Sequence, residues 1–388
     1  MTIDELLNDE TVRVIAFPVA GERIFMGHAG VAPIPQVAAD AIAAWGTQAA
    51  MGNQENAQSN KLVWETREAA AKLIGARPEE IALLGPTSLG LSLVARGLPW
   101  QPGDEVVYYA EDYPANVYPW SSLVEFGVKP VQLRPDSPGA IDWEVVEAVL
   151  TNRTRLVALA TCHFLSGYRI DIDAIGRRLR ERGILFCLDG IQSVGAFPHS
   201  MEHVDFLSAD SHKWMLGPVG AGIVYVRAER QEMLRPTLLG AANVRSPQFV
   251  AQEQMEFSAG ATRYEPGVLN LPGIFGMHAA MQLLLEYGIA AIAARLLEVR
   301  ARMAASLRAQ GYVVHGHAEE AGRASGILSV SHPGVDLDVV FLKLKNARIL
   351  ASLRENRAGL KLLRLSPHFY NTDAEVERVL EAMSTNSG

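Results

Sequence analysis

The chain is poor in cysteine and lacks an excess of basic charge. Its two cysteines, Cys162 and Cys187, both lie in apolar runs of a 388-residue sequence, so neither a disulfide framework nor a CxxC metal motif can form. The formal net charge is -8, whereas a nucleic-acid-binding surface would show a basic stripe. These absences exclude a disulfide-stabilised scaffold and argue against a nucleic-acid partner.

Signals for export or membrane insertion are also sparse. Residues 1–14 are acidic and lack the basic start and apolar run of a secretory signal. The most apolar long segment, residues 273–296, is interrupted by His278, Glu286 and Gly288, which favours two buried helices over a membrane span. We therefore expect a cytoplasmic protein without a membrane partner.

What is present is an alternation of two kinds of run. Short β-branched and apolar runs, such as residues 155–162, 184–189 and 204–210, are separated by amphipathic runs such as 171–183. This pattern predicts βαβ units around a buried, mainly parallel sheet, and hence the α/β fold class.

The pattern changes near residue 270. Two expected helices, 273–288 and 290–311, precede three expected strands, and residues 372–383 read as a helix capped by Thr372 or Asp373. Because 388 residues exceed what one hydrophobic core usually supports, we expect two domains. The large α/β domain would span residues 20–270, and a smaller α+β domain would comprise 271–388 together with 1–19.

Ligands of such sheets bind beyond the carboxyl ends of the strands. Thr87 and Ser88 lie between an expected strand and helix, where backbone N–H groups and hydroxyls can hold a phosphate. Asp189 ends another strand and is followed by Gln192. No GxGxxG motif precedes Asp189 after a first strand and no GxxxxGK[ST] loop occurs, so a nucleotide site lacks its main support.

Lys213 follows the run 204–210 and stands before a glycine-rich stretch. It is either a solvated charge at a strand end or an amine held in a dry pocket. Asp189 lies 24 residues earlier, which predicts neighbouring positions at the same sheet edge. An acid that stabilises a pyridinium, an amine that forms an imine and a Ser/Thr phosphate cup together predict a pyridoxal phosphate site.

Eight motifs stand along the chain in this order: GHAGVAPIP, GPTSLG, EDYPANVYPW, SGYRIDI, LDGIQSVG, DSHKWMLGPVGAGIVYVR, RYEPGVLNLPGI and LRLSPHFYNT. In order and spacing they resemble those of a known family, the class V aminotransferases of the fold type I pyridoxal phosphate enzymes. The resemblance is strongest to the branch of cysteine desulfurase-like and isopenicillin N epimerase-like proteins, and it runs from Phe25 to Val379. It implies a mainly parallel seven-stranded sheet sandwiched by helices.

The resemblance implies roles for individual residues. Lys213 would carry the pyridoxal 5'-phosphate as an aldimine and move the substrate's α proton by way of a quinonoid, while Asp189 would keep the ring nitrogen protonated. Gln192 would bond the ring phenolate oxygen and Tyr113 would stack on the ring. The phosphate would be lined by Thr87, Ser88, Ser211 and His212.

The same resemblance implies the substrate contacts. Arg364 would grip the substrate carboxylate, for which a bidentate guanidinium is suited. Asn116 and His28 are further candidates at the substrate. His163 follows an expected strand and is either a catalytic residue near the cofactor or a satisfied core histidine. Arg245, in the loop 238–261, is favoured as a solvated residue over a contact with an acidic substrate.

Two departures from the family pattern stand out. Val268 occupies the place of a threonine that reaches the partner subunit's phosphate, so Asn270 or backbone N–H groups would have to replace it. The loop that carries a nucleophilic cysteine in the desulfurases corresponds here to residues 351–363, which contain none. Desulfuration through a persulfide on the protein is therefore not expected.

The sequence predicts an enzyme whose small-molecule substrate is an α-amino acid, and family analogy favours an aminotransferase. A β-lyase of the C–S lyase type and an amino-acid epimerase use the same residues and stay open. So do a nucleotide-binding enzyme and a cofactor-binding protein without activity. The resemblance also implies a homodimer with sites near the subunit interface, and no metal is expected.

Overall fold

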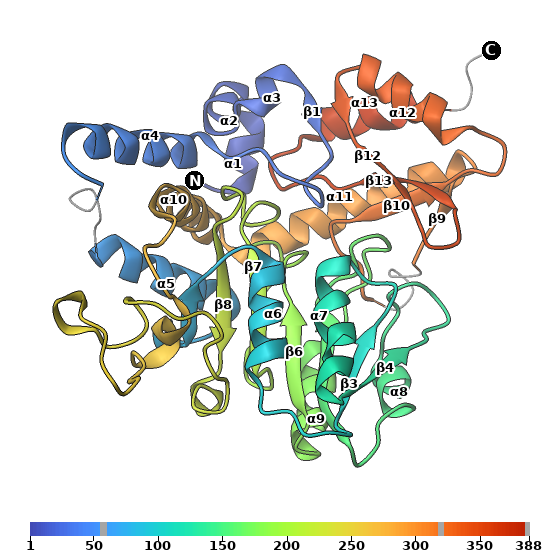
Figure 1. The fold of residues 1–388 in the computed structure, drawn as a ribbon. Helices are drawn as coiled ribbons and strands as arrows, with labels where there is room; N and C mark the ends of the chain where they lie inside the picture. The colour runs from blue at the N-terminus through green and yellow to red at the C-terminus, as the bar shows by residue number, and fades with distance from the viewer. Residues whose placement is uncertain (55–59, 317–321, 385–388) are drawn as a thin grey trace.

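A seven-stranded sheet forms the centre of the computed structural model, which describes residues 1–54, 60–316 and 322–384 (Figure 1). The strand order is β2-β8-β7-β6-β5-β3-β4, and β8 alone runs in the direction opposite to the other six strands. The expected mainly parallel sheet is thus confirmed. Its strands are β2 (Ile81–Leu83), β3 (Glu105–Tyr109), β4 (Lys129–Leu133), β5 (Thr154–Ala160), β6 (Leu185–Asp189), β7 (Phe206–Asp210) and β8 (Gly222–Val226).

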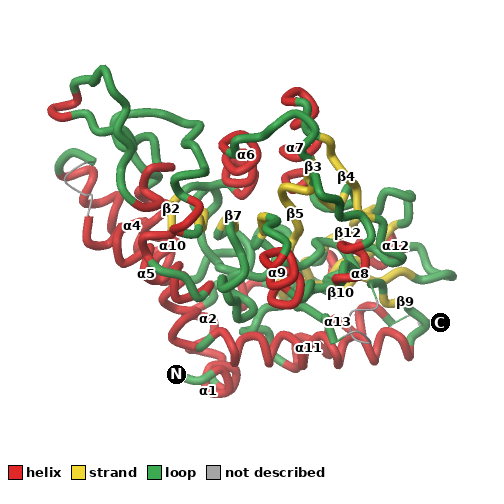
Figure 2. The backbone as a smooth tube through the Cα atoms, turned by 90° about the horizontal axis from the view of Figure 1, so that it is seen from below, coloured by secondary structure: helices red, strands yellow, loops and turns green. Residues whose placement is uncertain are grey.

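Helices bury both faces of this sheet. Val157 and Leu159 of β5 belong to one hydrophobic core, whereas Leu156 and Ala158 belong to the other, because successive side chains of a strand point to opposite faces. Figure 2 shows α6 and α7 on one side of the strands and α9 on the other. The covering helices are α6 (Thr87–Gly97) and α7 (Tyr118–Ser121) on the first side, and α5 (Asn60–Ile74), α8 (Trp143–Glu147), α9 (Ile172–Glu181) and α10 (Leu271–Tyr287) on the second.

A second, antiparallel sheet of four strands has the order β12-β13-β10-β9 and its own hydrophobic core. The last helix begins after a capping box at Thr372, as the sequence predicts. The elements of this C-terminal part are α11 (Ile289–Ala309), β9 (Val313–Val314), β10 (Leu328–Ser331), α12 (Leu337–Asn346), β11 (Ile349–Leu350), β12 (Ser352–Glu355), β13 (Lys361–Leu365) and α13 (Asp373–Met383).

The N-terminal segment contributes side chains to one core of the large sheet and to the core of the C-terminal sheet. Ile3 and Leu6 pack into the core of the large sheet, whereas β1 (Ile24–Phe25) pairs in parallel with β11 and places Ile24 in the C-terminal core. The buried side chains of α10 also join the core of the large sheet. The division at residue 270 stays a prediction. The remaining helices of this segment are α1 (Ile3–Asn8), α2 (Glu10–Ala16), α3 (Val19–Glu22) and α4 (Gln36–Met51).

Within the described ranges, no single helix has the length and apolar character to cross a membrane. Helices α10 and α11 meet those criteria only as a pair, and they are bent by 79° relative to each other. The break falls at Gly288, which has a φ of 84°, a conformation that favours glycine. The two helices expected from the sequence are therefore present as separate elements.

The carboxyl ends of the parallel strands meet at one edge of the large sheet. Asp189 is the last residue of β6 and pairs with Ala160 at the end of β5, while Asp210 ends β7. The segments that follow these strands hold most of the residues expected to be functional, in agreement with the general location of ligand sites in such sheets.

Candidate active site

A cleft of about 580 Å³ lies between this sheet edge and the C-terminal strands. It is lined by residues from the β1–α4 connection, from the start of α6 and from the segments after β3, β5, β6 and β7. Residues of β11, β12 and β13 complete the wall. The lining residues are Gly27, Ala29, Gly30, Val31, Pro86, Thr87, Ser88, Tyr113, Ala115, Phe164, Ile191, Gln192, His212, Lys213, Leu350, Ser352, Arg354 and Arg364.

Lys213 reaches this cleft from the turn after β7, and its side chain is almost completely buried. Burial lowers the pKa of its amine to about 8, because the charged form is poorly solvated there. The Asp189 carboxylate acts in the opposite direction, and the Arg364 guanidinium lowers the pKa further. A larger fraction of this amine than of an ordinary lysine is therefore uncharged near neutral pH.

Asp189 is buried at the end of β6. One of its carboxylate oxygens accepts a hydrogen bond from the Ile191 N–H at 3.0 Å, and the other makes no hydrogen bond to the described part of the chain. Burial and the nearby Asp112 carboxylate raise the pKa of Asp189 to about 7. A buried carboxylate with a free oxygen is suited to bind a protonated ring nitrogen.

Asp112 is a buried acid that sequence reasoning missed. It accepts hydrogen bonds from the Tyr113 N–H at 2.7 Å and from the Asn116 amide at 3.0 Å. Burial raises the pKa of Asp112 to about 6. The Asn116 carbonyl in turn accepts from the Trp120 indole at 2.9 Å, so Asn116 links two buried groups and does not line the cleft. Its expected substrate contact stays a prediction.

Gln192 lines the cleft with its amide held on two sides. Its Nε2 donates to the Ala29 carbonyl at 3.1 Å, and its Oε1 accepts from the Trp214 indole at 2.9 Å. Because an amide nitrogen carries two hydrogens, one donor is left for a ligand. Tyr113 borders the same cleft, where its ring centroid lies 5.3 Å from the Lys213 amine.

The start of α6 forms another wall. Thr87 and Ser88 both line the cleft, and the Thr87 hydroxyl accepts a hydrogen bond from the Asp210 N–H at 2.8 Å. No side chain caps this helix, so its first N–H groups are available to an anion. His212 lines the cleft beside them, with Nδ1 at 3.1 Å from the Asp210 carboxylate.

Arg364 enters the cleft from β13 and is 2% exposed. Its Nη1 donates to the Phe164 carbonyl at 2.7 Å, whereas its buried Nε has no hydrogen-bond partner in the described chain. Burial and the charge of Arg354 lower the pKa of Arg364 to about 9. A buried guanidinium with an unused donor is suited to bind a carboxylate.

Five other expected residues do not line the cleft, and the buried Asp189 described above is one of them. Ser211 is fully buried and donates to the Pro218 carbonyl at 2.9 Å. Asn270 is exposed, caps α10 and lies near Val268 in a separate small cavity. The other two are His163 and His28.

Both histidines lie in the core. Nδ1 of His163 accepts from the Ser166 N–H at 3.2 Å, and Nε2 donates to the Glu111 carbonyl at 3.2 Å. Burial lowers the pKa of His163 to about 4, so the ring is neutral. His28 bonds the Ser366 carbonyl at 2.9 Å and the Tyr370 hydroxyl at 2.8 Å, and burial lowers its pKa well below the usual range. The catalytic role of His163 and the substrate contact of His28 stay predictions.

Comparison with known proteins places this geometry in a family. The family model described as "Aminotransferase class-V" matches residues 24–379. The chain belongs to the class V aminotransferases. Similar curated members are a "Probable cysteine desulfurase" of Methanothermobacter thermautotrophicus, 28% identical over 346 residues with 85% of each chain covered, and the "Uncharacterized aminotransferase YcbU" of Bacillus subtilis, 27% identical over 325 residues with 83% of each covered.

Solved structures confirm the class V fold. The apo cysteine desulfurase of Thermococcus onnurineus superposes with a TM-score of 0.87 at 23% identity, covering 96% of this chain and 97% of that one. A complex between the cystine C-S lyase C-DES and its reaction product, cysteine persulfide, gives a TM-score of 0.85 at 20% identity, covering 95% and 99%. At these identities the likeness establishes the fold alone.

The class V family uses pyridoxal phosphate, and the residues that line the cleft, together with the buried Asp189, fit that cofactor. The buried Lys213 amine, the free oxygen of Asp189 and the uncapped start of α6 match an aldehyde, a protonated ring nitrogen and a phosphate in chemical type. Holding the cofactor would fall to these groups, with Gln192 and Tyr113 beside them.

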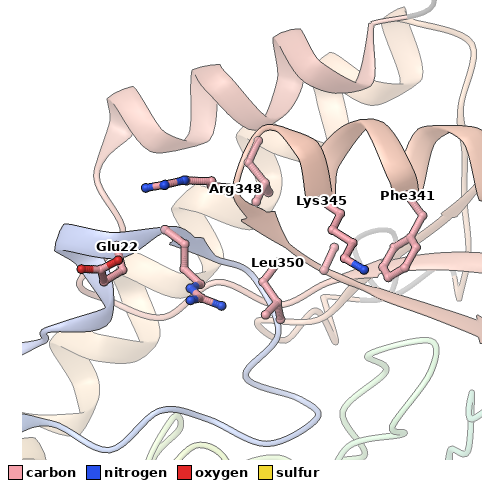
Figure 3. Close-up of a pocket in the computed structure, with 8 residues that line it drawn as sticks. Glu22, Phe341, Lys345, Arg348 and Leu350 are labelled. Carbon is pink, nitrogen blue, oxygen red and sulfur yellow. The ribbon is translucent and has the colours of Figure 1, made fainter.

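A second cavity, of about 470 Å³, lies behind β11 between α3 and α12 (Figure 3). It is bordered by Lys345 and Phe341 from α12 and by Glu22 from α3. Leu350 lines both this cavity and the cleft that contains Lys213. None of the residues that the sequence singled out lies in it.

Arg354 is the cleft residue that sequence reasoning overlooked. It projects from β12 beside Arg364, within residues 351–363, for which the sequence indicates only the lack of a cysteine. The alternation of Ser352 and Arg354 along the strand was the available signal. Arg245, by contrast, is an exposed loop residue paired with Glu256 at 3.0 Å, as favoured from the sequence.

Proposed function

We propose that this chain catalyses transamination of an α-amino acid with pyridoxal phosphate as its cofactor. One observation carries the proposal: Lys213, Asp189 and Arg364 come from three different strands or strand ends, and both other residues act electrostatically on the Lys213 amine. A protein that only bound the cofactor would need neither a residue that transfers a proton nor an arginine that binds a substrate carboxylate.

The residues divide the chemistry among them. Lys213 would provide the amine that holds the cofactor, and the same amine would take the proton from the substrate Cα. Its lowered pKa of about 8 favours the uncharged form that both tasks require. When bound, pyridoxal phosphate supplies an electron-accepting ring that stabilises negative charge at Cα. Asp189 keeps a proton on the ring nitrogen and so maintains that capacity.

Arg364 sets the orientation of the substrate. Its unused buried donor and its place opposite the sheet edge fit a two-point contact with the α-carboxylate. The substrate would be held at two points, its carboxylate at Arg364 and its amino group near Lys213. These two contacts fix the direction of the Cα–H bond, and this fixed orientation supplies part of the rate enhancement. For transamination, the Lys213 amine would not return this proton to Cα.

A β-lyase is the second candidate, because several curated relatives carry the name cysteine desulfurase and one similar structure is a cystine C-S lyase. Such an enzyme would not carry sulfur on its own cysteine. Cys162 and Cys187 are both buried in the sheet cores, and burial raises the pKa of the Cys162 thiol to about 11. Sulfur would leave on a small molecule instead.

Two assays test the proposal. Protein incubated with pyridoxal phosphate is reduced with borohydride and digested, and we expect the pyridoxyl group on the peptide that contains Lys213. The loaded protein is then given a panel of amino acids with and without 2-keto acids. Transamination needs the keto acid and yields a new amino acid, β-elimination releases ammonia or sulfide without it, and epimerisation removes optical activity.

Two results of these assays would contradict the proposal. A protein that stays colourless with pyridoxal phosphate would favour a nucleotide-binding enzyme. A yellow protein that converts no amino acid would be a binding protein without activity.

We further propose that the protein works as a cytoplasmic homodimer. The location is supported by two free cysteines, which are typical of a reducing compartment. The dimer is supported by large apolar side chains exposed on the segment 238–270, among them Phe249 at 89% and Val268 at 86%. Asn270 lies on this surface, where it could reach a partner's phosphate. Sedimentation analysis measures the oligomeric state.

A further inference from the structure

Two arginines from neighbouring strands line the same cleft. Arg364 pairs with Ser352 across the antiparallel β13–β12 ladder, and Arg354 lies two residues beyond Ser352. Side chains two residues apart on a strand share a face, and directly paired residues do so as well. Arg354 and Arg364 are therefore diagonal neighbours on one face of the hairpin.

The backbone at Gly30 gives the distance between the two guanidinium groups an upper limit. A Cβ at this position would lie 3.7 Å from Nη2 of Arg364 and 3.8 Å from Nη2 of Arg354. The two nitrogens thus cannot be farther apart than these two short distances together. Within that limit, one small diacid whose carboxylates are joined by two or three carbons can contact both guanidinium groups.

No acidic residue compensates these charges within the cleft. Its lining contains Lys213, Arg354 and Arg364 but neither aspartate nor glutamate. Glu355 follows Arg354 directly and therefore points to the other side of β12, where it borders a different cavity. Neither arginine forms an ion pair with another side chain in the described ranges, and each lowers the pKa of Lys213.

We propose that Arg354 forms a second anion subsite, so that the preferred substrate is an α-amino acid with an acidic group on its side chain. The inference rests on the proposed function, in which Arg364 holds the α-carboxylate. Arg354 is the more exposed of the two, at the rim, and meets the distal acid. A neutral amino acid forms no ion pair with Arg354, so it gains less binding free energy than an acidic one.

The alternative is that both guanidinium groups grip a single carboxylate. Substitution of Arg354 would then weaken binding of every amino acid to the same degree. A distal subsite instead makes the loss selective for acidic ligands. The two arrangements are therefore separated by comparing diacids with monoacids in the same variants.

Calorimetry at pH 7 with unreactive acids is the direct test. We expect the cofactor-loaded protein to bind succinate about tenfold more tightly than butyrate, which has the same number of carbons. R354Q abolishes that preference. R357Q is the matched control, because Arg357 lies in the turn between β12 and β13 and borders the cavity that Glu355 also borders, and it keeps the preference. Equal binding of the two acids by the unchanged protein overturns the proposal.

Turnover provides a second readout. We expect kcat/KM for aspartate, glutamate or cysteine sulfinate to exceed that for alanine and cysteine, and R354Q to reduce this ratio about tenfold. A visible cofactor absorbance equal to that of the unchanged protein shows that the variant folds. An unchanged ratio in R354Q, or an equal loss for all five amino acids, contradicts the subsite.

The outcome is separable from that of the proposed function. If no pyridoxyl group appears on Lys213, the proposed function fails, but the preference for succinate can still be measured by calorimetry on the protein without cofactor. If Lys213 is labelled and the preference is absent, the subsite alone is wrong.

Discussion

The Lys213 amine lies 5.3 Å from the centroid of the Tyr113 ring, so the reactive nitrogen and an aromatic face border the same space. The Tyr113 ring also packs edge-on against Phe164, with centroids 5.6 Å apart. Tyr113 is nevertheless 48% exposed. An aromatic ring that is held at its edge and open on its face is ready to stack on a planar ligand.

Replacing this ring weakens cofactor binding. We expect Tyr113→Ala to raise the dissociation constant of pyridoxal phosphate up to about tenfold, since ring contacts contribute on the order of 1 kcal/mol. Tyr113→Phe keeps the aromatic face and serves as the control. Titration followed by cofactor absorbance gives both constants. Equal constants for the two variants would show that the ring does not contact the cofactor.

The buried amine makes the cofactor-free protein less stable than it could be. The pKa of Lys213 is lowered from 10.5 to about 8, so above pH 10.5 the amine is neutral in both states and carries no penalty. As the pH falls from 10.5 to 8, the unfolded chain gains a proton that the folded chain resists, and the penalty grows. Below pH 8 it is constant.

We therefore expect Lys213→Met to stabilise the cofactor-free protein at pH 7 by on the order of 1–3 kcal/mol. The gain should disappear above about pH 10.5, the ordinary pKa of the amine. Urea unfolding across this pH range measures it. Lys345→Met, at an exposed lysine of the second cavity, is the control and should show no such pH dependence. A pH-independent gain would argue against a charge penalty.

Close contact between α6 and the sheet depends on Gly90. A Cβ there would lie 2.3 Å from the Ser208 hydroxyl and 2.6 Å from a Val224 methyl. We expect Gly90→Ala to cost about 1–3 kcal/mol and to weaken pyridoxal phosphate binding, because the start of α6 must shift. Thermal unfolding and cofactor titration measure the two effects.

Gly46 provides the matched control for this substitution. It lies in the helix α4, and a Cβ there would meet no atom within 4 Å. Gly46→Ala should therefore stabilise the protein by about 0.5–1 kcal/mol, as alanine does in an open helix position. If Gly90→Ala were equally well tolerated, the start of α6 would not be set by this contact.

The two cysteines should be dispensable for activity. We expect Cys162→Ala with Cys187→Ala to lose about 1 kcal/mol of stability per site and to keep its rate with amino acids, because both thiols are buried away from the cleft. Incubation with cysteine followed by mass spectrometry should show no sulfur added to the unchanged protein. A stable persulfide on either residue would indicate a desulfurase that uses its own thiol.

Prediction from sequence succeeded where a residue's place follows from its strand. Lys213 and Gln192 follow β7 and β6 directly, and both line the cleft. Sequence-based prediction was less informative for side chains that have several possible hydrogen-bond partners nearby. His163 also follows a strand, but its ring bonds Ser166 and the Glu111 carbonyl, and Asn116 bonds Asp112 and Trp120. A motif does not show which hydrogen bonds a side chain completes within the core.

The amino-acid sequence by itself determined the buried parallel sheet and the edge at which the chemistry lies, because apolar periodicity acts locally and parallel strands share a carboxyl edge. Only the tertiary structure decided that Arg354 joins Arg364 in the cleft. The face of β12 follows from its pairing with β13 and from the close approach of Gly30, more than 300 residues earlier in the chain. Such contacts depend on long-range packing, which the local pattern does not encode.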